Sequence, residues 1–243
     1  MARLNIKHAD DYSQTLFPEY LKETEMQYII NTPQTHTDPF HLEWLQGMTL
    51  TDYGMPQIEA YNDTLPARLI PFHEARAGYY SGVATTGCPH FYIEDSRFMC
   101  LLNDLPKYTT MLSCFPMVIT PDFSIKMDMP EPMKMYNSYL NKVIGRYLQL
   151  HNVSTIPNVV WAGPNSYHYC FAGYPKGSVV AVNSMGIKGD SRSVFFWLKG
   201  YEEMLTRLRP SHIIRYGEMI PGENVSISTF YSNNHLNRMR HGR

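Results

Sequence analysis

Short apolar runs separated by helical patterns organise the chain from about residue 67 onward. The runs that predict strands are ARLIPF, HFYIED, PMVITPD, TIPNVVWAG, GSVVAVNSMG and SHIIRYGE. They are continuous rather than alternating, which is typical of strands buried on both faces of a parallel sheet. Each of the last four closes on a polar, glycine or tryptophan residue, so we expect polar loops at their carboxyl ends.

Two long helical patterns lie between these runs. Residues 129–150 and 192–208 each carry apolar residues at i, i+3, i+4 and i+7 spacing, and the second pattern stops before Pro210. Two shorter helices are expected over residues 96–105 and 106–115. We expect the apolar stripe of the longest helix to face the core. Its opposite side carries Lys134, Ser138, Asn141, Lys142 and Gln149.

Strands that alternate with helices predict βα units with right-handed crossovers. The expected fold class is α/β, a mainly parallel sheet with flanking helices, either open or barrel-like, with a slight preference for the barrel-like form. Residues 1–65 are rich in turns and prolines, with one or two short helices within 11–30, and predict an irregular N-terminal extension. Residues 66–220 then form the α/β core domain, and 221–243 form a C-terminal strand and a basic tail.

Polar side chains follow the predicted strands, where ligands bind in parallel α/β folds. The sequence predicts two catalytic residues, Asp122 as general base or acid and Arg146 as a partner for an anionic group. Glu94 and Asp95 follow an earlier strand. The predicted substrate-binding residues are Ser124, Lys142, Trp161, Asn183, Ser184 and Tyr216. Carboxylates, amides, hydroxyls and an aromatic platform suit a small polar ligand with a ring, such as a sugar, nucleoside or nucleotide.

Each candidate also has a structural interpretation, and both stay open. Asp122 follows a proline and is suited to an Asx-turn. Asp128 and Glu131 have the spacing of a capping box for the longest helix, which we favour over catalysis for Asp128. Trp161 suits a core position equally well. Arg146 either pairs with a buried carboxylate such as Asp122 or reaches solvent.

Composition and charge narrow the function classes. Hydrophobic residues make up 44% of the 243 and charged residues 18%, so a substantial core can form. The net charge of −1 argues against a protein that mainly grips duplex phosphates, although the end HLNRMRHGR is basic. There is no signal-peptide core and no run long enough to span a membrane. We therefore expect a cytoplasmic protein with its cysteines reduced.

Familiar cofactor and metal motifs do not occur. The chain has no G-x-x-x-x-G-K-[ST], G-x-G-x-x-G, G-x-S-x-G or H-E-x-x-H motif. Cys88, His90, His168 and Cys170 lack the spacing of a zinc site, so we predict no metal and leave the cofactor open.

Several segments, in order, are similar to one family. HFYIEDSRF, TPDFSIKMDMP, YNSYLNKVIGRYLQ, TIPNVVWAG, GSVVAVNSMG, KGYEEMLTRLRP and IIRYGE resemble domain-of-unknown-function family 4417 of bacteria and their phages. The resemblance covers about residues 68–218 and implies a phage, prophage or mobile-element context without implying a reaction. Lys142 stands where family members often carry arginine, which argues against a role that needs a bidentate guanidinium there.

Three function classes follow from these observations. The first is an enzyme, or a descendant of one, that acts on a nucleotide-like or sugar-like small molecule. The second is a non-enzymatic accessory protein that binds a protein partner through residues 1–65. The third, which the net charge disfavours, is a nucleic-acid binder that uses the basic tail.

Overall fold

The chain forms two compact units, Met1–Gly47 and Met48–Arg243. The computed structural model describes residues 40–83, 85–187 and 189–231. In the described part of the first unit, the 3-10 helix Leu42–Leu45 follows His41, whose ring stacks on Trp44 with 4.0 Å between centroids. The helices predicted within residues 11–30 and the basic tail lie outside the described residues.

The described residues of the second unit form seven short strands, and all of the paired strands are parallel. They are β1 (Leu69–Pro71), β2 (Cys88–His90), β3 (Val118–Ile119), β4 (Thr155–Ile156), β5 (Val179–Asn183), β6 (His212–Tyr216) and β7 (Ser228–Tyr231). They pair as β1-β2, β3-β4 and β5-β6-β7. A single bridge between Asn158 and Ala181 links the segment after β4 to β5.

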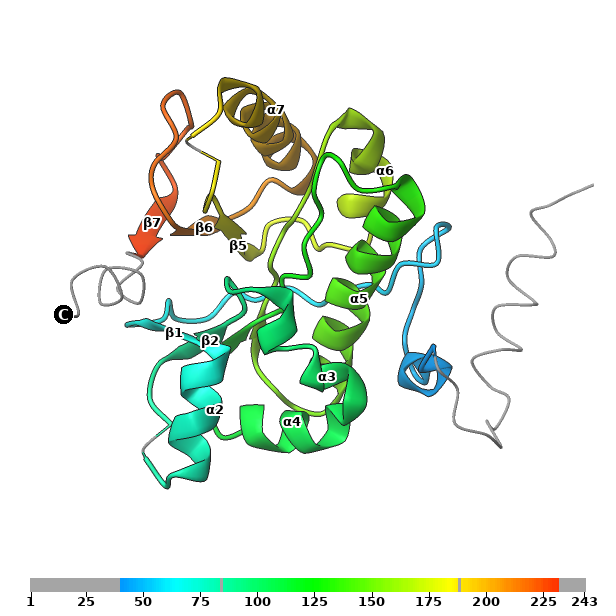
Figure 1. The fold of residues 1–243 in the computed structure, drawn as a ribbon, viewed down its shortest axis with the longest axis vertical. Coiled ribbons are helices and arrows are strands. Elements are labelled where there is room, and N and C mark those ends of the chain that lie inside the picture. The colour runs from blue at the N-terminus through cyan, green and yellow to red at the C-terminus, as the bar shows by residue number, and fades with distance from the viewer. Residues whose placement is uncertain (1–39, 84, 188, 232–243) are drawn as a thin grey trace, which may run out of the picture. The chain divides into compact units, whose positions relative to one another are not determined.

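Helices alternate with these strands, as Figure 1 shows. They are α2 (Phe72–Tyr80), α3 (Cys100–Asn103), α4 (Leu105–Leu112), α5 (Glu131–Leu150), α6 (Tyr167–Cys170) and α7 (Ser191–Leu208). Two 3-10 helices, Asp95–Arg97 and Pro164–Ser166, lie in loops. The predicted α/β class with parallel strands is therefore confirmed. None of the described helices is long and apolar enough to cross a membrane.

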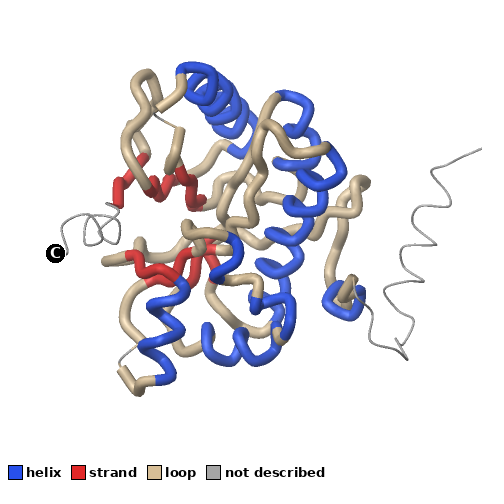
Figure 2. Tube along the Cα trace, viewed as in Figure 1, coloured by secondary structure: helices blue, strands red, loops and turns tan. Residues whose placement is uncertain are grey.

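The preference for a barrel-like sheet is wrong. The strands form three separate sheets, and ladders of two to five residues are joined by long loop segments (Figure 2).

One predicted strand is also displaced, because β2 ends at His90 and HFYIED leads into a 3-10 helix instead. After His90 the backbone bonds locally: Ile93 N–H donates to the carbonyl of Phe91 at 2.7 Å.

The start of α5 corrects the predicted capping box. Its N-cap is Pro130, and no side chain caps it. The Glu131 carboxylate accepts a hydrogen bond from the Tyr169 hydroxyl at 2.6 Å and pairs with Lys134 at 3.2 Å. Asp128 is exposed. Glu131 is committed to Tyr169 and Lys134, so the D-x-x-E spacing does not act as a cap.

The polar side of α5 is buried, contrary to the simple amphipathic prediction. Ser138, Asn141 and Lys142 are each only 1% exposed, whereas Tyr136 of the predicted apolar stripe is 45% exposed. Gly145 allows a close approach, as its place inside the helix suggests, because an added Cβ would lie 2.8 Å from Thr120 Cγ2. Polar groups bury here because they bond to backbone, as described below.

Residues 48–65 pack into the second unit. Ile58 N–H donates to the carbonyl of Gly173 at 2.8 Å, and Tyr61 N–H donates to Ser178 Oγ at 2.9 Å. The domain boundaries predicted at residues 65 and 220 stay predictions. Two apolar clusters among the described residues contribute to the core, one around α6 and α7 and one among residues of β2 to β6.

Candidate functional site

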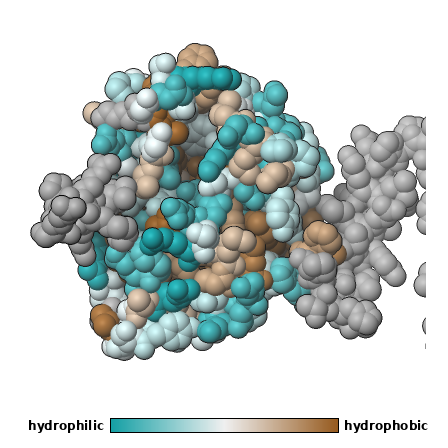
Figure 3. Space-filling view, in the orientation of Figure 1, coloured by the Kyte–Doolittle hydropathy of each residue, from teal (hydrophilic) through white to brown (hydrophobic). Residues whose placement is uncertain are grey.

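A pocket of about 560 Å³ opens where the loops after β3, β4 and β5 meet the first turns of α7. In Figure 3 the surface is hollowed between α7 and the loops that face it, and apolar residues lie in the recess. Because the strands are parallel, their carboxyl ends deliver these three loops to the same place.

Asp122 lies in the wall of this pocket, held through both oxygens. Asn158 Nδ2 donates to Oδ1 at 2.9 Å, and Asn183 Nδ2 donates to Oδ2 at 3.3 Å. Burial raises the pKa of Asp122 to about 7, although the two amide bonds oppose the rise; the nearby Asp95 carboxylate raises it slightly further. The side chain stays partly exposed at the pocket. A carboxyl group that titrates near neutrality can both accept and donate a proton.

Asn158 is the buried residue that orients Asp122. Its Nδ2 also donates to the carbonyl of Pro121 at 3.1 Å, and its Oδ1 accepts from the Tyr92 hydroxyl at 3.0 Å. A carbonyl can only accept, so the amide nitrogen is fixed on the side of Pro121 and Asp122. The backbone of Asn158 is held as well, because its carbonyl accepts from Tyr174 and its N–H donates to Thr120 Oγ1 at 2.8 Å.

The buried polar side of α5 holds the loop that carries Asp122. Asn141 Oδ1 accepts from Phe123 N–H at 2.6 Å, and Asn141 Nδ2 donates to the carbonyl of Phe123 at 3.1 Å. Asn137 Nδ2 donates to the carbonyl of Ser124 at 2.7 Å. Asp95 accepts from Ser124 Oγ at 2.8 Å and from its N–H at 3.1 Å. The two residues that follow Asp122 are therefore held by α5 and by Asp95.

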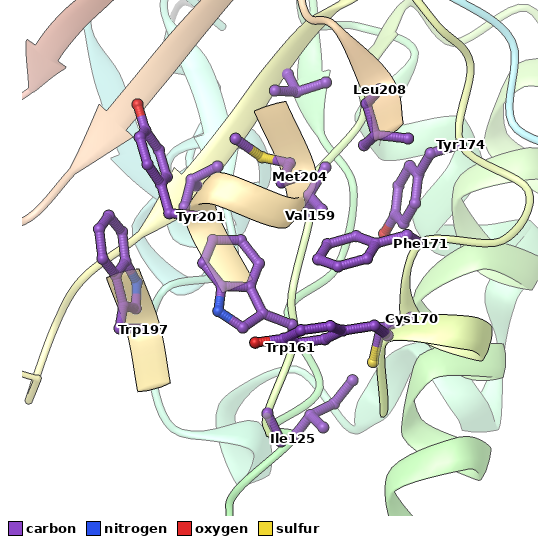
Figure 4. Close-up of a cluster of buried hydrophobic side chains, with 14 of the residues drawn as sticks. Ile125, Val159, Trp161, Cys170, Phe171, Tyr174, Trp197, Tyr201, Met204 and Leu208 are labelled. Atoms are coloured by element: carbon purple, nitrogen blue, oxygen red, sulfur yellow. The ribbon is translucent and has the colours of Figure 1, made fainter. Parts of the chain in front are cut away.

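Aromatic side chains form the apolar part of the pocket. Trp161 and Trp197 lie 5.7 Å apart between ring centroids, and Phe196 precedes Trp197 on α7. Figure 4 shows Trp161 between Trp197 and Phe171, with Ile125 nearby. Trp197 Nε1 donates to the carbonyl of Asn183 at 3.1 Å, which ties α7 to the end of β5.

Four of the predicted site residues come together at this pocket: Asp122, Ser124, Trp161 and Asn183. Trp161 is both a core residue and a pocket residue. It is 8% exposed and packs in the core, and part of it lines the pocket. The other four predicted residues do not line it.

Lys142 and Arg146 point elsewhere. Lys142 Nζ donates to Ser138 Oγ at 2.7 Å and to the carbonyl of Tyr169 at 3.3 Å, and burial lowers its pKa to about 8. Arg146 pairs with Glu59 at 2.5 Å rather than with Asp122. Neither cation lies where it would hold an anionic group of a ligand in this pocket.

Ser184 and Tyr216 serve the ends of β5 and β6. Ser184 Oγ donates to the carbonyl of Glu218 at 2.6 Å. The Tyr216 ring is 3% exposed and stacks on Tyr92, with centroids 4.8 Å apart. Burial raises the pKa of Tyr216 to about 12. Ser184 thus bonds to loop backbone and Tyr216 packs against another ring, and neither residue lines the pocket.

Sequence reasoning missed Asn158, Phe196 and Trp197. Asn158 is hidden inside the apolar run TIPNVVWAG, and the two aromatic residues lie within the predicted helix 192–208 but outside its i, i+3, i+4, i+7 stripe. A buried amide in the middle of a predicted strand is a signal that marks Asn158, since such groups need several partners. Among the described residues there is no group of three or more His, Cys, Asp or Glu side chains that could hold a metal.

Two phage proteins are similar to the chain. The gene 1 protein of Mycobacterium phage D29 is 30% identical over 155 residues, which cover 64% of this chain and 57% of that protein. The gene 1 protein of Mycobacterium phage L5 is 29% identical over 167 residues, 69% of this chain and 72% of that protein. The chain thus spans less than two thirds of the D29 relative. No solved structure matches it.

The family resemblance found in the motifs extends through the pocket. Residues 48–232 match a family described as a domain of unknown function (DUF4417), and this range contains every residue of the pocket described above. The chain belongs to the DUF4417 family, and the similar proteins named above come from phages.

Proposed function

We propose that the pocket binds a small polar molecule with a ring, nucleotide-like or sugar-like, and that Asp122 acts on it as a general acid or base. The observation that carries the proposal is the position of Asp122, a carboxyl group with a pKa near 7 in the wall of a partly aromatic pocket. Polar groups for recognition and an apolar wall are typical of small-molecule sites.

The hydrogen bonds around Asp122 support a role as general base, because they stabilise its ionised form. Both carboxylate oxygens accept from amides, so the ionised form is stabilised against burial. The free lone pairs of Asp122 are left for a donor group of the ligand. Asn183 accepts from Met185 N–H at 2.8 Å through its own oxygen, so its amide nitrogen stays directed to Asp122.

The aromatic residues of the pocket would bind the ring of the ligand, in addition to the polar contact with Asp122. Phe196 is half-buried, lines the pocket, and presents a ring that a flat ligand can contact. Contacts between aromatic rings contribute about 0.5–1.5 kcal/mol beyond the area that they bury.

A thermal-shift panel of nucleosides, nucleotides and monosaccharides tests the proposal. A ligand at 100 times its Kd stabilises the folded state by about 2.7 kcal/mol, which raises Tm measurably. We expect a shift with at least one ring-containing compound, and loss of that shift in Phe196→Ala and Asp122→Asn. Phe195→Ala is the matched control, because Phe195 is the neighbouring residue on α7, is 55% exposed and does not line the pocket.

Two outcomes contradict the proposal. One is a panel in which no compound shifts Tm. The other is a shift that Phe195→Ala and Phe196→Ala reduce equally, because that ligand binds outside the pocket.

A further inference from the structure

The first turn of α7 and the residues around it decide which ring-containing ligands the pocket can hold. Its described lining contains the carboxylates of Asp122 and Asp128, and Lys126 is the one cationic side chain among those lining residues. Lys126 is exposed and lies two positions from Asp128 in the same loop. With Asp122 ionised, the described lining has more negative than positive charge.

The first turn of α7 would ordinarily attract an anion, but it is already occupied. The N-cap Asp190 accepts from Ser193 N–H at 2.8 Å, from Ser193 Oγ at 2.7 Å and from Arg192 N–H at 3.3 Å. Free backbone N–H groups at a helix N-terminus bind phosphate well. Here a carboxylate of the chain itself takes those donors, and Ser193 is a residue of the pocket lining.

The positive charge of Arg192 also acts on the Asp190 carboxylate. The Ser193 hydrogen bonds lower the pKa of Asp190, and the positive charge of Arg192 lowers it further. Arg192 is exposed and lies over the Phe196 ring at 5.8 Å. The first N–H groups of α7 therefore bond to a carboxylate of the chain, and the same carboxylate interacts with the charge of Arg192.

Three buried or partly buried cations among the described residues bond to partners away from the pocket lining. Arg215 donates to Glu223 Oε2 at 2.8 Å in a pair whose side chains are both fully buried. Lys142 donates to Ser138 and Tyr169, and Arg146 pairs with Glu59. None of the three lines the pocket.

We infer that the pocket selects an unphosphorylated ring, a nucleoside or free sugar whose N–H or O–H groups donate to Asp122, and rejects its phosphorylated counterpart. The inference rests on the proposed function and names its substrate class. A phosphate placed near Asp122, Asp128 and Asp190 meets like charges, which oppose its binding.

Isothermal titration with matched pairs tests the inference. Adenosine is compared with adenosine 5′-monophosphate, and glucose with glucose 6-phosphate, at fixed ionic strength and pH 8. We expect the uncharged member of the binding pair to bind at least about tenfold more tightly than its phosphate, which corresponds to about 1.4 kcal/mol. If the phosphate binds equally well or better, the inference is overturned while the proposed function stands. If no member of either pair binds, both fail.

Variants of Asp190 show whether its charge causes the discrimination. Asp190→Ala frees the helix N-terminus and Arg192, so the preference for the uncharged ligand should fall below about threefold. Asp190→Asn keeps a capping side chain and removes the charge, so it should reduce the preference while preserving Tm better than alanine. A preference that is unchanged in both variants contradicts the assigned role of Asp190.

Asp104→Ala provides the matched control for loss of a cap. Asp104 is the N-cap of α4, accepts from Lys107 N–H at 3.2 Å and does not line the pocket. Its removal should lower Tm about as Asp190→Ala does, and leave the tenfold preference intact. Equal loss of preference in Asp104→Ala would assign the effect to stability alone, and would overturn the role of Asp190.

Discussion

Asp122 is the residue on which the account of the site depends, and its environment sets its chemistry. Two amides favour the charged carboxylate while burial disfavours it, and the balance gives a pKa of about 7. This balance differs from that of an Asx-turn aspartate, whose side chain is usually exposed and bonds to its own backbone. The proposed function takes Asp122 as a site residue on the basis of this environment.

The first prediction concerns the pH dependence of binding. A ligand that donates to Asp122 prefers the ionised form, so affinity should rise with pH through about 7 and become constant above it. The rise should be up to about tenfold between pH 6 and 8. Isothermal titration across this range measures it. Asp122→Asn should bind weakly at every pH without a step, and a wild-type profile without a step would contradict the role of Asp122.

A second prediction tests how Asn158 is oriented. Tyr92→Phe removes the hydroxyl that donates to Asn158 Oδ1, which should cost about 1 kcal/mol in the free energy of unfolding. The amide is then less firmly held, so its support of the Asp122 anion weakens and the pKa of Asp122 should rise. A carboxyl carbon NMR titration reads this pKa directly. An unchanged value would show that Pro121 alone fixes the amide.

At the scale of elements, α5 and the loop after β3 act as one assembly. Asn141 satisfies both backbone groups of Phe123, and Asn137 bonds the next residue, so the polar side of the helix is buried with its hydrogen bonds made. Buried polar groups are tolerated in proteins when they are paired in this way. The same contacts fix the backbone on which Asp122 is carried.

The third prediction compares two asparagines of α5. Asn141→Ala leaves the buried N–H and C=O of Phe123 without their partners and should cost about 2–4 kcal/mol in the free energy of unfolding. Asn137→Ala removes one bond at a partly exposed position and should cost about 1 kcal/mol. Urea denaturation of both variants checks the order. A smaller loss of unfolding free energy in Asn141→Ala than in Asn137→Ala would contradict the proposed role of Asn141 in holding Phe123.

Packing between α7 and Trp161 gives a fourth prediction. Gly200 has no room for a side chain, because an added Cβ would clash with the Trp161 indole. Gly200→Ala should therefore destabilise the fold by about 1–3 kcal/mol, although alanine favours helices. Gly189→Ala is the control, since no atom lies within 4 Å of an added Cβ there. Equal melting temperatures for the two variants would contradict this packing.

At the scale of the whole molecule, Asp122 and Lys142 make opposite contributions to the change of stability with pH. Asp122 has a folded pKa of about 7, above its usual 3.8, so the folded state binds its proton more tightly and loses stability as pH rises from about 4 to 7. Lys142 has a folded pKa of about 8, below its usual 10.5, so its contribution rises between about pH 8 and 10.5.

The fifth prediction is read from differences between wild type and variants. Denaturation curves at pH 4 to 10 should show that Asp122→Asn removes the loss of folding stability that occurs as pH rises from about 4 to 7. Lys142→Met should remove the increase on the alkaline side. Wild-type and variant curves that stay parallel throughout would contradict the perturbed environments of both groups.

Much of the fold was predictable from the sequence, because the buried runs and long helical stripes are local signals. The carboxyl-end rule for parallel strands also found Asp122 and Asn183, whose loops meet for topological reasons. Lys142 and Arg146 were not brought to the pocket, because which side of α5 meets the loop depends on tertiary contacts such as Asn141 with Phe123. Three short sheets instead of a barrel likewise follow from long-range packing.

The most direct test of the central claim is a crystal structure of the protein soaked with the compound that gives the largest thermal shift. The account predicts density for the ring beside Phe196 and Trp161, with a donor atom of the ligand within 3.2 Å of an Asp122 carboxylate oxygen. A ligand bound elsewhere on the molecule, at concentrations that saturate binding in solution, would contradict the claim that this pocket is the functional site.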